Sequence, residues 1–274
     1  MFEAEKRNLN TTQSALGIME VIYYATARSV RKTHPNAFIG LAINMFQTMM
    51  LVSVFYVMFV LLGMRGIAVR GDFLVYIMSG IFLYMTQNKA LGAVIGSEGP
   101  TSPMMQHAPM STFIAIVSAA LGTLYIQVLS AVVVLFIYDA WTGAVEINDP
   151  VGTFSMLLLA WFVGASIGMC FLALKPWFPQ FAGIASTIFM RANMLASGKM
   201  FLANSMPYYM LKMFDWNPLF HIIDQARGFA FINYNPHYSN TTYPLIVACI
   251  MLTLGFMGES YTRKHASMSW GARR

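Results

Sequence analysis

Two cationic side chains, Arg191 and Lys199, lie in the apolar run 181–203. A charge is costly there if the run crosses a lipid bilayer, and such charges usually face a helix-bundle interior or a polar cavity. Two turns of a continuous helix would place Arg191, Leu195 and Lys199 on one face. No Asp or Glu lies in the middle of another apolar run, so this face favours binding of an anionic substrate in a polar channel. Packing against helix-end carbonyl groups is the alternative role for the two cations.

A second pattern, His221 with Asp224, has the spacing of half a metal site. The sequence offers no second half, so a hydrogen bond or a helix cap is the expected role of the pair. The only Gly-Lys pair, Gly198-Lys199, lacks the preceding glycine and following Ser or Thr of a phosphate-binding loop. We therefore expect no catalytic residue, metal or cofactor on this chain. If ATP drives its activity, ATP and Mg²⁺ bind a separate subunit.

Composition places these residues in a membrane protein. The chain has 274 residues, of which 57% are hydrophobic and 10% charged. Soluble domains have about 45–50% apolar and about 25% charged residues, and disordered chains are richer still in charge. The net charge of +6 is explained by cationic membrane flanks, so we expect no nucleic-acid partner. Cys170 and Cys249 lie in apolar runs and are interpreted as small buried hydrophobic residues.

The elements that position the candidate residues are membrane helices. A spanning helix needs about 20 mostly apolar residues, and barrel strands are shorter and alternate in polarity. The fold class expected is an all-α polytopic membrane protein of six transmembrane helices, with one domain over residues 1–274. The six runs are Phe38–Leu62, Phe73–Ile95, Ser111–Tyr138, Gly152–Leu174, Phe181–Ala203 and Tyr243–Glu259. Lys89 lies near one end of its run, where its amine can extend to the membrane surface.

Six spans put both termini on one side, and cationic residues mark the cytoplasmic side. The loop 139–151 carries three acidic residues and no Lys or Arg, so it faces outward. Both termini are therefore expected in the cytoplasm. The absence of a disulfide framework and the short outer loops fit a bacterial inner membrane. The two terminal flanks hold nine of the 17 cationic residues, namely Lys6, Arg7, Arg28, Arg31, Lys32, Arg263, Lys264, Arg273 and Arg274.

Two further segments complete the layout. The N-terminal region 1–36 is expected to be cytoplasmic or interfacial. Within it, the apolar residues of 11–34 recur at helical spacing and are followed by cationic residues. This pattern predicts an amphipathic helix at the membrane surface. A helix simply buried against the bundle is the alternative. The first five spans lie within residues 37–203, and the last span and the basic tail occupy 243–274. The segment 204–242 between them faces outward. It is apolar but interrupted by prolines, which predicts a re-entrant pair of helices at about 207–215 and 218–231.

Small residues on one face of the fourth span form a further pattern. Gly164 and Gly168 are one turn apart and allow close approach of another helix. Packing within the chain and a seam between two copies both fit this pattern.

Local motifs resemble those of ABC exporter membrane subunits for polysaccharides, above all capsular polysaccharide export permeases. O-antigen and teichoic acid exporter permeases are more distant. Ser197-Gly198-Lys199-Met200-Phe201, followed by Pro207, resembles the S-G-x-x-F…P motif before the outer helices. Asn217-Pro218-Leu219-Phe220-His221, followed by Asp224 and Arg227, resembles the stretch N-P-h-x-H…[ED]…R, where h is apolar. Lys199 occupies a position that is commonly apolar in relatives.

The resemblance implies a homodimer that binds two ATPase subunits and exports a lipid-linked or nascent polysaccharide. Periplasmic and outer-membrane export proteins are further partners that such a system uses. A channel would be lined by Arg191, Asn193, Lys199 and Phe201. An outer gate would contain Trp216, Asn217, Pro218, His221, Asp224 and Arg227. ATPase movements would reach the bundle through Gln106, His107 and Pro109, in the cytoplasmic loop 96–110, and through the N-terminal helix.

Three alternatives stay open at this point. One is an ABC exporter of the same architecture whose cargo is a drug or a lipid. Another is an ion-coupled secondary transporter, which needs carboxylates within spans, whereas no Asp or Glu lies in the middle of any span here. The third is a membrane enzyme such as a transferase, which needs a catalytic cluster.

Overall fold

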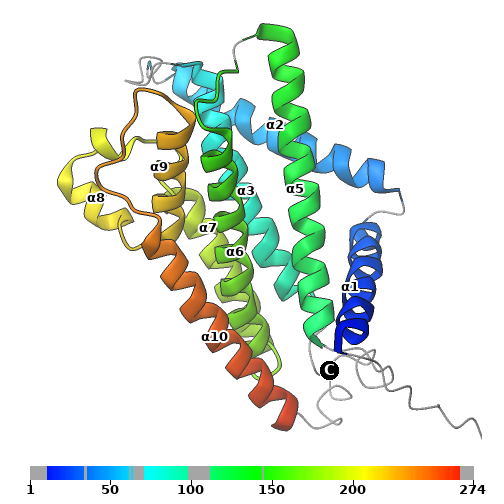
Figure 1. Cartoon of the computed structure of the whole chain (residues 1–274). Coiled ribbons are helices and arrows are strands. Elements are labelled where there is room, and N and C mark those ends of the chain that lie inside the picture. Colours follow the sequence, from blue (N-terminus) through cyan, green and yellow to red (C-terminus); the bar gives the residue numbers. More distant parts are fainter. Residues whose placement is uncertain are drawn as a thin grey trace, which may run out of the picture.

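The computed structural model of the chain describes residues 11–33, 36–61, 63, 71–97, 112–143 and 145–265. This described portion is 83% helical and contains no strand. Figure 1 shows the helices gathered side by side, with α1 beside α5 and α8 at the periphery. The elements are α1 (Thr11–Thr33), α2 (Ala37–Leu61), α3 (Phe73–Ile95), α5 (Thr112–Thr142), α6 (Pro150–Leu174), α7 (Pro179–Ala196), the 3-10 turn η1 (Ala203–Ser205), α8 (Tyr208–Phe214), α9 (Pro218–Ala230) and α10 (Thr242–His265).

Four of the described helices are long and apolar enough to cross a membrane. They are Phe38–Leu61 in α2, Thr112–Thr142 in α5, Pro150–Leu174 in α6 and Thr242–His265 in α10. This confirms the expected all-helical fold with helices suited to a multi-pass membrane protein. The other two predicted spans also form helices but do not meet the same criterion. Polar residues lower the hydropathy of both helices, namely the run 87–89 in α3 and Gln180, Arg191 and Asn193 in α7.

Helix α3 is packed closely against α6 through the small residues of the fourth predicted span. A Cβ atom added to Gly164 would lie 2.3 Å from the carbonyl oxygen of Gln87, and one added to Gly168 would lie 2.9 Å from that of Leu91. Real side chains do not tolerate such distances, so α3 and α6 approach because both positions are glycine. Of the two interpretations of this face, the structure therefore supports packing within the chain.

Polar side chains fix the two ends of the bundle. Asp72 caps α3 by accepting from the backbone N–H of Leu74, and its second carboxylate oxygen accepts from the Tyr138 hydroxyl at 2.8 Å. At the opposite end of α5, the Thr112 hydroxyl donates to the buried carboxylate of Glu259 on α10 at 2.7 Å. These contacts hold the ends of α5 against α3 and α10.

The N-terminal helix α1 lies against α5, where Gly122 leaves room for it. A Cβ atom at Gly122 would lie 3.2 Å from the Ser29 hydroxyl oxygen. Leu16, Met19 and Tyr23 on α1 are exposed. The predicted helix 11–34 is confirmed as a helix, with one side packed on the bundle and several apolar side chains outside it.

The predicted span 181–203 is wrong at its end. Helix α7 stops at Ala196, and Gly198 follows with φ +68°, a left-handed conformation that only glycine adopts without strain. The chain reverses there, so Lys199 does not continue the face that carries Arg191 and Leu195. Gly198 is a local signal for such a helix end, but it does not decide the outcome, because Ser-Gly is also tolerated within membrane helices.

The segment 204–242 contains the two short helices expected of it. The predicted ranges 207–215 and 218–231 correspond to α8 and α9. In Figure 1, α8 (yellow) projects from the side of the bundle, whereas α9 lies next to α6. Consistent with that position, ten of the 13 residues of α9 are buried.

Candidate functional site

Helix α9 and its N-cap carry four polar residues of the candidate site. Asn217 caps its first turn by accepting from the backbone N–H of Leu219 at 3.0 Å, and Pro218 occupies the first helical position. The helix is amphipathic, yet His221, Asp224 and Arg227 all lie among its buried residues. Each of these side chains must therefore find partners inside the protein.

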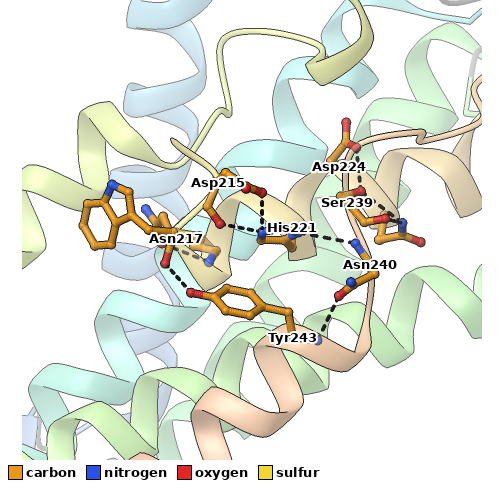
Figure 2. Close-up of polar contacts among 10 residues, drawn as sticks. Asp215, Asn217, His221, Asp224, Ser239, Asn240 and Tyr243 are labelled. Carbon is orange, nitrogen blue, oxygen red and sulfur yellow. Dashed lines mark hydrogen bonds and ion pairs between the residues drawn. The ribbon is translucent and has the colours of Figure 1, made fainter. Parts of the chain in front are cut away.

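His221 links the start of α9 to the chain that enters α10. Its Nε2 lies 2.7 Å from the carbonyl oxygen of Asp215, and its Nδ1 accepts from the backbone N–H of Asn240 at 3.3 Å. Since Asn240 N–H is a donor, Nδ1 is the acceptor, and the proton is on Nε2. Figure 2 shows the ring held between the two segments. His221 therefore bridges backbone groups of the two segments, and its Nε2 also lies 3.3 Å from the exposed carboxylate of Asp215.

Asp224 ties α9 to the return segment before α10. Its carboxylate accepts from the Tyr234 hydroxyl and from the Ser239 hydroxyl, the latter at 2.6 Å (Figure 2). Burial and the neighbouring Asp224 charge raise the pKa of Tyr234 above its ordinary value, so the tyrosine remains a donor. The half metal site suggested by the spacing of His221 and Asp224 is not formed, because the two side chains bond to different segments.

Asn193 and Asn217 join α7 to α9. The Asn217 amide donates to the Asn193 side-chain oxygen at 2.9 Å and to the Ala196 carbonyl oxygen at 2.9 Å. Trp216 lies just before α9 with its side chain exposed, and its carbonyl oxygen accepts from the Tyr243 hydroxyl at 2.7 Å (Figure 2). These bonds fix both ends of the short connection between α8 and α9.

Arg227 holds the turn that follows α7. Its guanidinium donates to three backbone carbonyl oxygens, those of Gly198, Lys199 and Phe201, with the Phe201 bond at 2.7 Å. The guanidinium carbon also lies 4.0 Å from the ring centroid of Tyr76 on α3. Arg227 is 1% exposed, so it is a structural cation with most of its donors satisfied by the main chain.

Lys199 lies next to Arg227 but has quite different surroundings. Its ammonium is 3.7 Å from the ring centroid of Tyr84 and 4.8 Å from that of Phe55, and no hydrogen-bond acceptor contacts it within the described residues. A Cβ atom at Gly80 would lie 3.0 Å from the Lys199 side chain, so this glycine admits the turn against α3. Lys199 is 4% exposed.

The α3 residues that receive the two cations did not stand out in the sequence. Tyr76, Gly80 and Tyr84 follow one another at four-residue spacing and so share a face of α3. This spacing is a sequence signal for cation binding, since two tyrosines on either side of a glycine on one helix face can each bind a cation. It was hidden among many aromatic residues of an apolar helix.

Arg191 lies on the exposed side of α7. The same side presents four large apolar residues, Phe181, Ile184, Ile188 and Leu195, each at least 62% exposed. Arg191 also lies within electrostatic range of Tyr84, whose side chain hydrogen-bonds with Asn88. Arg191 and Lys199 do not share a helix face, because α7 ends at Ala196 and the chain reverses at Gly198.

The remaining site residues lie partly outside the described ranges. Phe201 contributes its carbonyl oxygen to the bond with Arg227. Gln106, His107 and Pro109, the expected ATPase contacts, lie outside the described residues. In the portion of the chain that is described, no three His, Cys, Asp or Glu side chains come together as metal ligands would.

Comparison with known proteins adds no further identification. No family model matches this sequence, and no curated protein matches it. The function of the chain is therefore inferred from its own residues and their geometry.

Proposed function

We propose that this chain is the membrane-spanning permease subunit of an ATP-driven exporter that moves cell-surface polysaccharide across a bacterial inner membrane. In this proposal α3 and α7 cross the membrane together with the four more apolar helices. Both termini lie in the cytoplasm, and α8 and α9 form a re-entrant pair on the outer side. ATP and Mg²⁺ bind a separate ATPase subunit, because the chain has no phosphate-binding loop.

One observation carries the transport proposal, namely the position of Arg191. A permanently charged guanidinium on an exposed apolar helix face would be costly against lipid acyl chains. The exposed position of Arg191 becomes favourable when this face of α7 borders a polar path through the membrane. Two copies of the chain that face each other would enclose such a path. Arg191 then lies at its wall, and the cation can contact a passing hydrophilic cargo.

The cargo is assigned from the resemblance to capsular polysaccharide export permeases together with the composition of the site. Residues 197–201 and 217–227 carry the resemblance, and these two stretches are joined by Arg227. Aromatic side chains around the path suit sugar rings, because they combine flat apolar faces with polar edges. Exposed Tyr208, Tyr209 and Trp216 lie on or just after α8, where a gate would meet the cargo.

The proposal is tested by purifying the tagged chain from its native membrane in mild detergent. We expect an ATPase subunit to co-purify at a one-to-one ratio, with hydrolysis of ATP by the complex. We also expect Arg191→Ala to reduce surface polysaccharide, while Lys175→Ala, at the exposed C-terminal end of α6, leaves it unchanged. A stable complex without an ATPase and without nucleotide dependence would show that the chain is not an ABC exporter subunit.

A cargo other than polysaccharide has a distinct outcome in the same experiment. ATPase co-purification with unchanged surface polysaccharide in cells that lack the chain would retain the exporter class. It would assign the cargo to the drug or lipid alternative.

A further inference from the structure

We infer that His221 and His237 fasten the segment 231–241 by two pH-sensitive contacts, which hold it while the rings are neutral and release it when they are protonated. This segment joins α9 to α10 and, in the proposed orientation, faces outward. The inference goes beyond the proposed function, since it concerns the response of the segment to protons and does not depend on the cargo.

The first contact joins His221 on α9 to the end of the segment (Figure 2). The Nδ1 atom of His221 accepts from the backbone N–H of Asn240 at 3.3 Å, while its Nε2 donates to the carbonyl oxygen of Asp215 at 2.7 Å. Asn240 in turn accepts at its side-chain oxygen from the backbone N–H of Tyr243 in the first turn of α10, at 2.9 Å. The neutral His221 ring therefore fixes the point at which the segment enters α10.

The second contact joins His237, within the segment, to Asn204 in the turn η1. The Asn204 amide nitrogen donates to the carbonyl oxygen of Asn235 at 2.7 Å, and the Asn204 side-chain oxygen accepts from the backbone N–H of His237 at 3.3 Å. These two bonds fix the orientation of the amide, so its nitrogen is the donor to His237 Nδ1, 3.1 Å away. His237 thus also binds its partner through a ring nitrogen that carries no proton.

Protonation changes the hydrogen-bonding role of both Nδ1 atoms. An imidazolium carries a proton on each ring nitrogen, so Nδ1 would face an N–H group and the hydrogen bond would be replaced by repulsion. Histidine is the side chain whose ordinary charge change falls between about pH 5 and about pH 8. Both contacts are therefore formed at the upper end of this range and are lost toward its lower end.

The surroundings of the two rings admit a proton and its charge. Asn204, His237 and Asn240 are exposed, so solvent reaches the second contact and borders the first. The Asp215 carboxylate, whose side chain is 59% exposed, lies 3.3 Å from Nε2 of His221. It would balance the charge of an imidazolium at this buried position.

The other charged and titratable groups around His221 have partners of their own. Tyr243 of α10 lies against the His221 ring, with centroids 4.9 Å apart, and its hydroxyl donates to the carbonyl oxygen of Trp216. Helix α6 contains no Asp, Glu, Lys, Arg or His. Among the described residues, the remaining pairs are Asp224 with Tyr234 and Ser239, Arg227 with backbone carbonyls and Tyr76, Lys199 with Tyr84, Lys89 with Gln47, Lys212 with Tyr208, and Cys170 with the Met251 carbonyl.

A third attachment of the segment contains no histidine and limits the movement. The Ser239 hydroxyl donates to Asp224 at 2.6 Å, and the Ser239 carbonyl oxygen accepts from the Gln225 side chain at 2.8 Å. Tyr234 also donates to Asp224. We therefore expect protonation to increase the mobility of the segment between these attachments, while the segment stays on the bundle.

The test follows the mobility of a spin label at residue 238, between the two histidine contacts. The Tyr238 side chain is 51% exposed, so Tyr238→Cys can carry the label. The full chain, with Cys170→Ser and Cys249→Ser, is studied in phosphatidylcholine nanodiscs by electron paramagnetic resonance. We expect the mobility of the label to rise about twofold between about pH 8 and about pH 5. A spectrum that does not change over this range would overturn the inference.

Variants assign the response to the two rings. Gln keeps a hydrogen-bonding side chain but does not titrate, so His221→Gln and His237→Gln should each reduce the pH response, and the double variant should abolish it. A full response in the double variant would assign the change to other groups and overturn the inference. If His221→Gln does not fold, Asn204→Ala decides, because it removes the exposed partner of His237. An unchanged pH response in Asn204→Ala would overturn the inference.

A label outside the segment is the matched control. Val151, at the start of α6, is 79% exposed, and neither histidine contacts it. A label on Val151→Cys should show the same spectrum at both pH values. An equal rise in mobility at residues 151 and 238 would mean a global change of the chain and overturn the inference. ATPase co-purification is measured separately, so a chain without the pH response could still be an exporter subunit.

Discussion

Arg227 donates a hydrogen bond from Nη2 to the backbone carbonyl oxygen of Lys199, so the two buried cations are joined through the main chain. The Arg227 side chain fixes the turn, and the turn sets the position of the Lys199 side chain. One cation is thus structural and the other is held in place by it. Substitutions at the two positions should have opposite effects on stability.

Arg227→Met should lower the free energy of unfolding by about 3 kcal/mol or more, because it leaves buried carbonyl oxygens without donors. Lys199→Met should leave it unchanged or raise it by about 1 kcal/mol, because it removes an unpartnered buried charge. Thermal unfolding in detergent, followed by tryptophan fluorescence, compares the two variants with the wild type. A larger loss in Lys199→Met than in Arg227→Met would contradict the assignment of roles.

Gly164→Ala should destabilise the chain by about 1–3 kcal/mol, because the added methyl group would overlap the backbone of Gln87. Gly183→Ala on α7 is the matched control, since a Cβ atom there has no neighbour within 4 Å. Alanine should be neutral or slightly stabilising at that position, as it favours the helix. The melting temperatures of the two variants in detergent check this, and equal values would show that α3 and α6 are not in close contact.

His221→Ala should cost about 1–3 kcal/mol, because the carbonyl of Asp215 and the N–H of Asn240 both lose their partner. Asp215→Asn keeps the carbonyl oxygen that His221 binds, and the Asp215 side chain is 59% exposed, so this change should be close to neutral. Hydrogen exchange at residues 231–241 distinguishes the two variants. Exchange in Asp215→Asn as fast as in His221→Ala would mean that the contact between His221 Nε2 and the Asp215 carboxylate, rather than the carbonyl bond, holds the segment.

Tyr234→Phe should destabilise the chain at neutral pH, because Asp224 loses a donor. Since the pKa of Tyr234 is raised in the folded chain, an unfolded chain ionises this tyrosine first as the pH increases. The stability that Tyr234 contributes is therefore fully present below about pH 10 and declines progressively as the pH rises above it. Melting temperatures of wild type and Tyr234→Phe between about pH 8 and pH 11 should converge; a constant difference would refute the predicted ionisation.

Most of the fold could be predicted because membrane helices are recognisable by their length and polarity. The run 73–95 matches α3 at both ends, and the prolines at 207 and 218 mark the starts of α8 and α9. The end of α7 could not be predicted, because Gly198 can continue a helix or reverse the chain. The outcome depends on whether α3 leaves space for the turn, and Gly80 provides it.

The site was predicted in its residue types but not in its contacts. Arg191, Lys199 and Arg227 are noticeable as charges in an apolar sequence. Their partners are backbone carbonyls and tyrosine rings, which every segment of such a chain contains in abundance. A hydrogen bond between residues 28 positions apart, as between Arg227 and Lys199, leaves no trace in local spacing.

The sequence separation of this bond also sets an order of events during synthesis. The ribosome adds about 5–20 residues per second, so Lys199 precedes Arg227 by about 1–6 s. Phe55, Gly80 and Tyr84 have already been made when Lys199 leaves the ribosome. The nascent chain can therefore place the ammonium between its two rings first, and translation of α9 then locks the turn behind it.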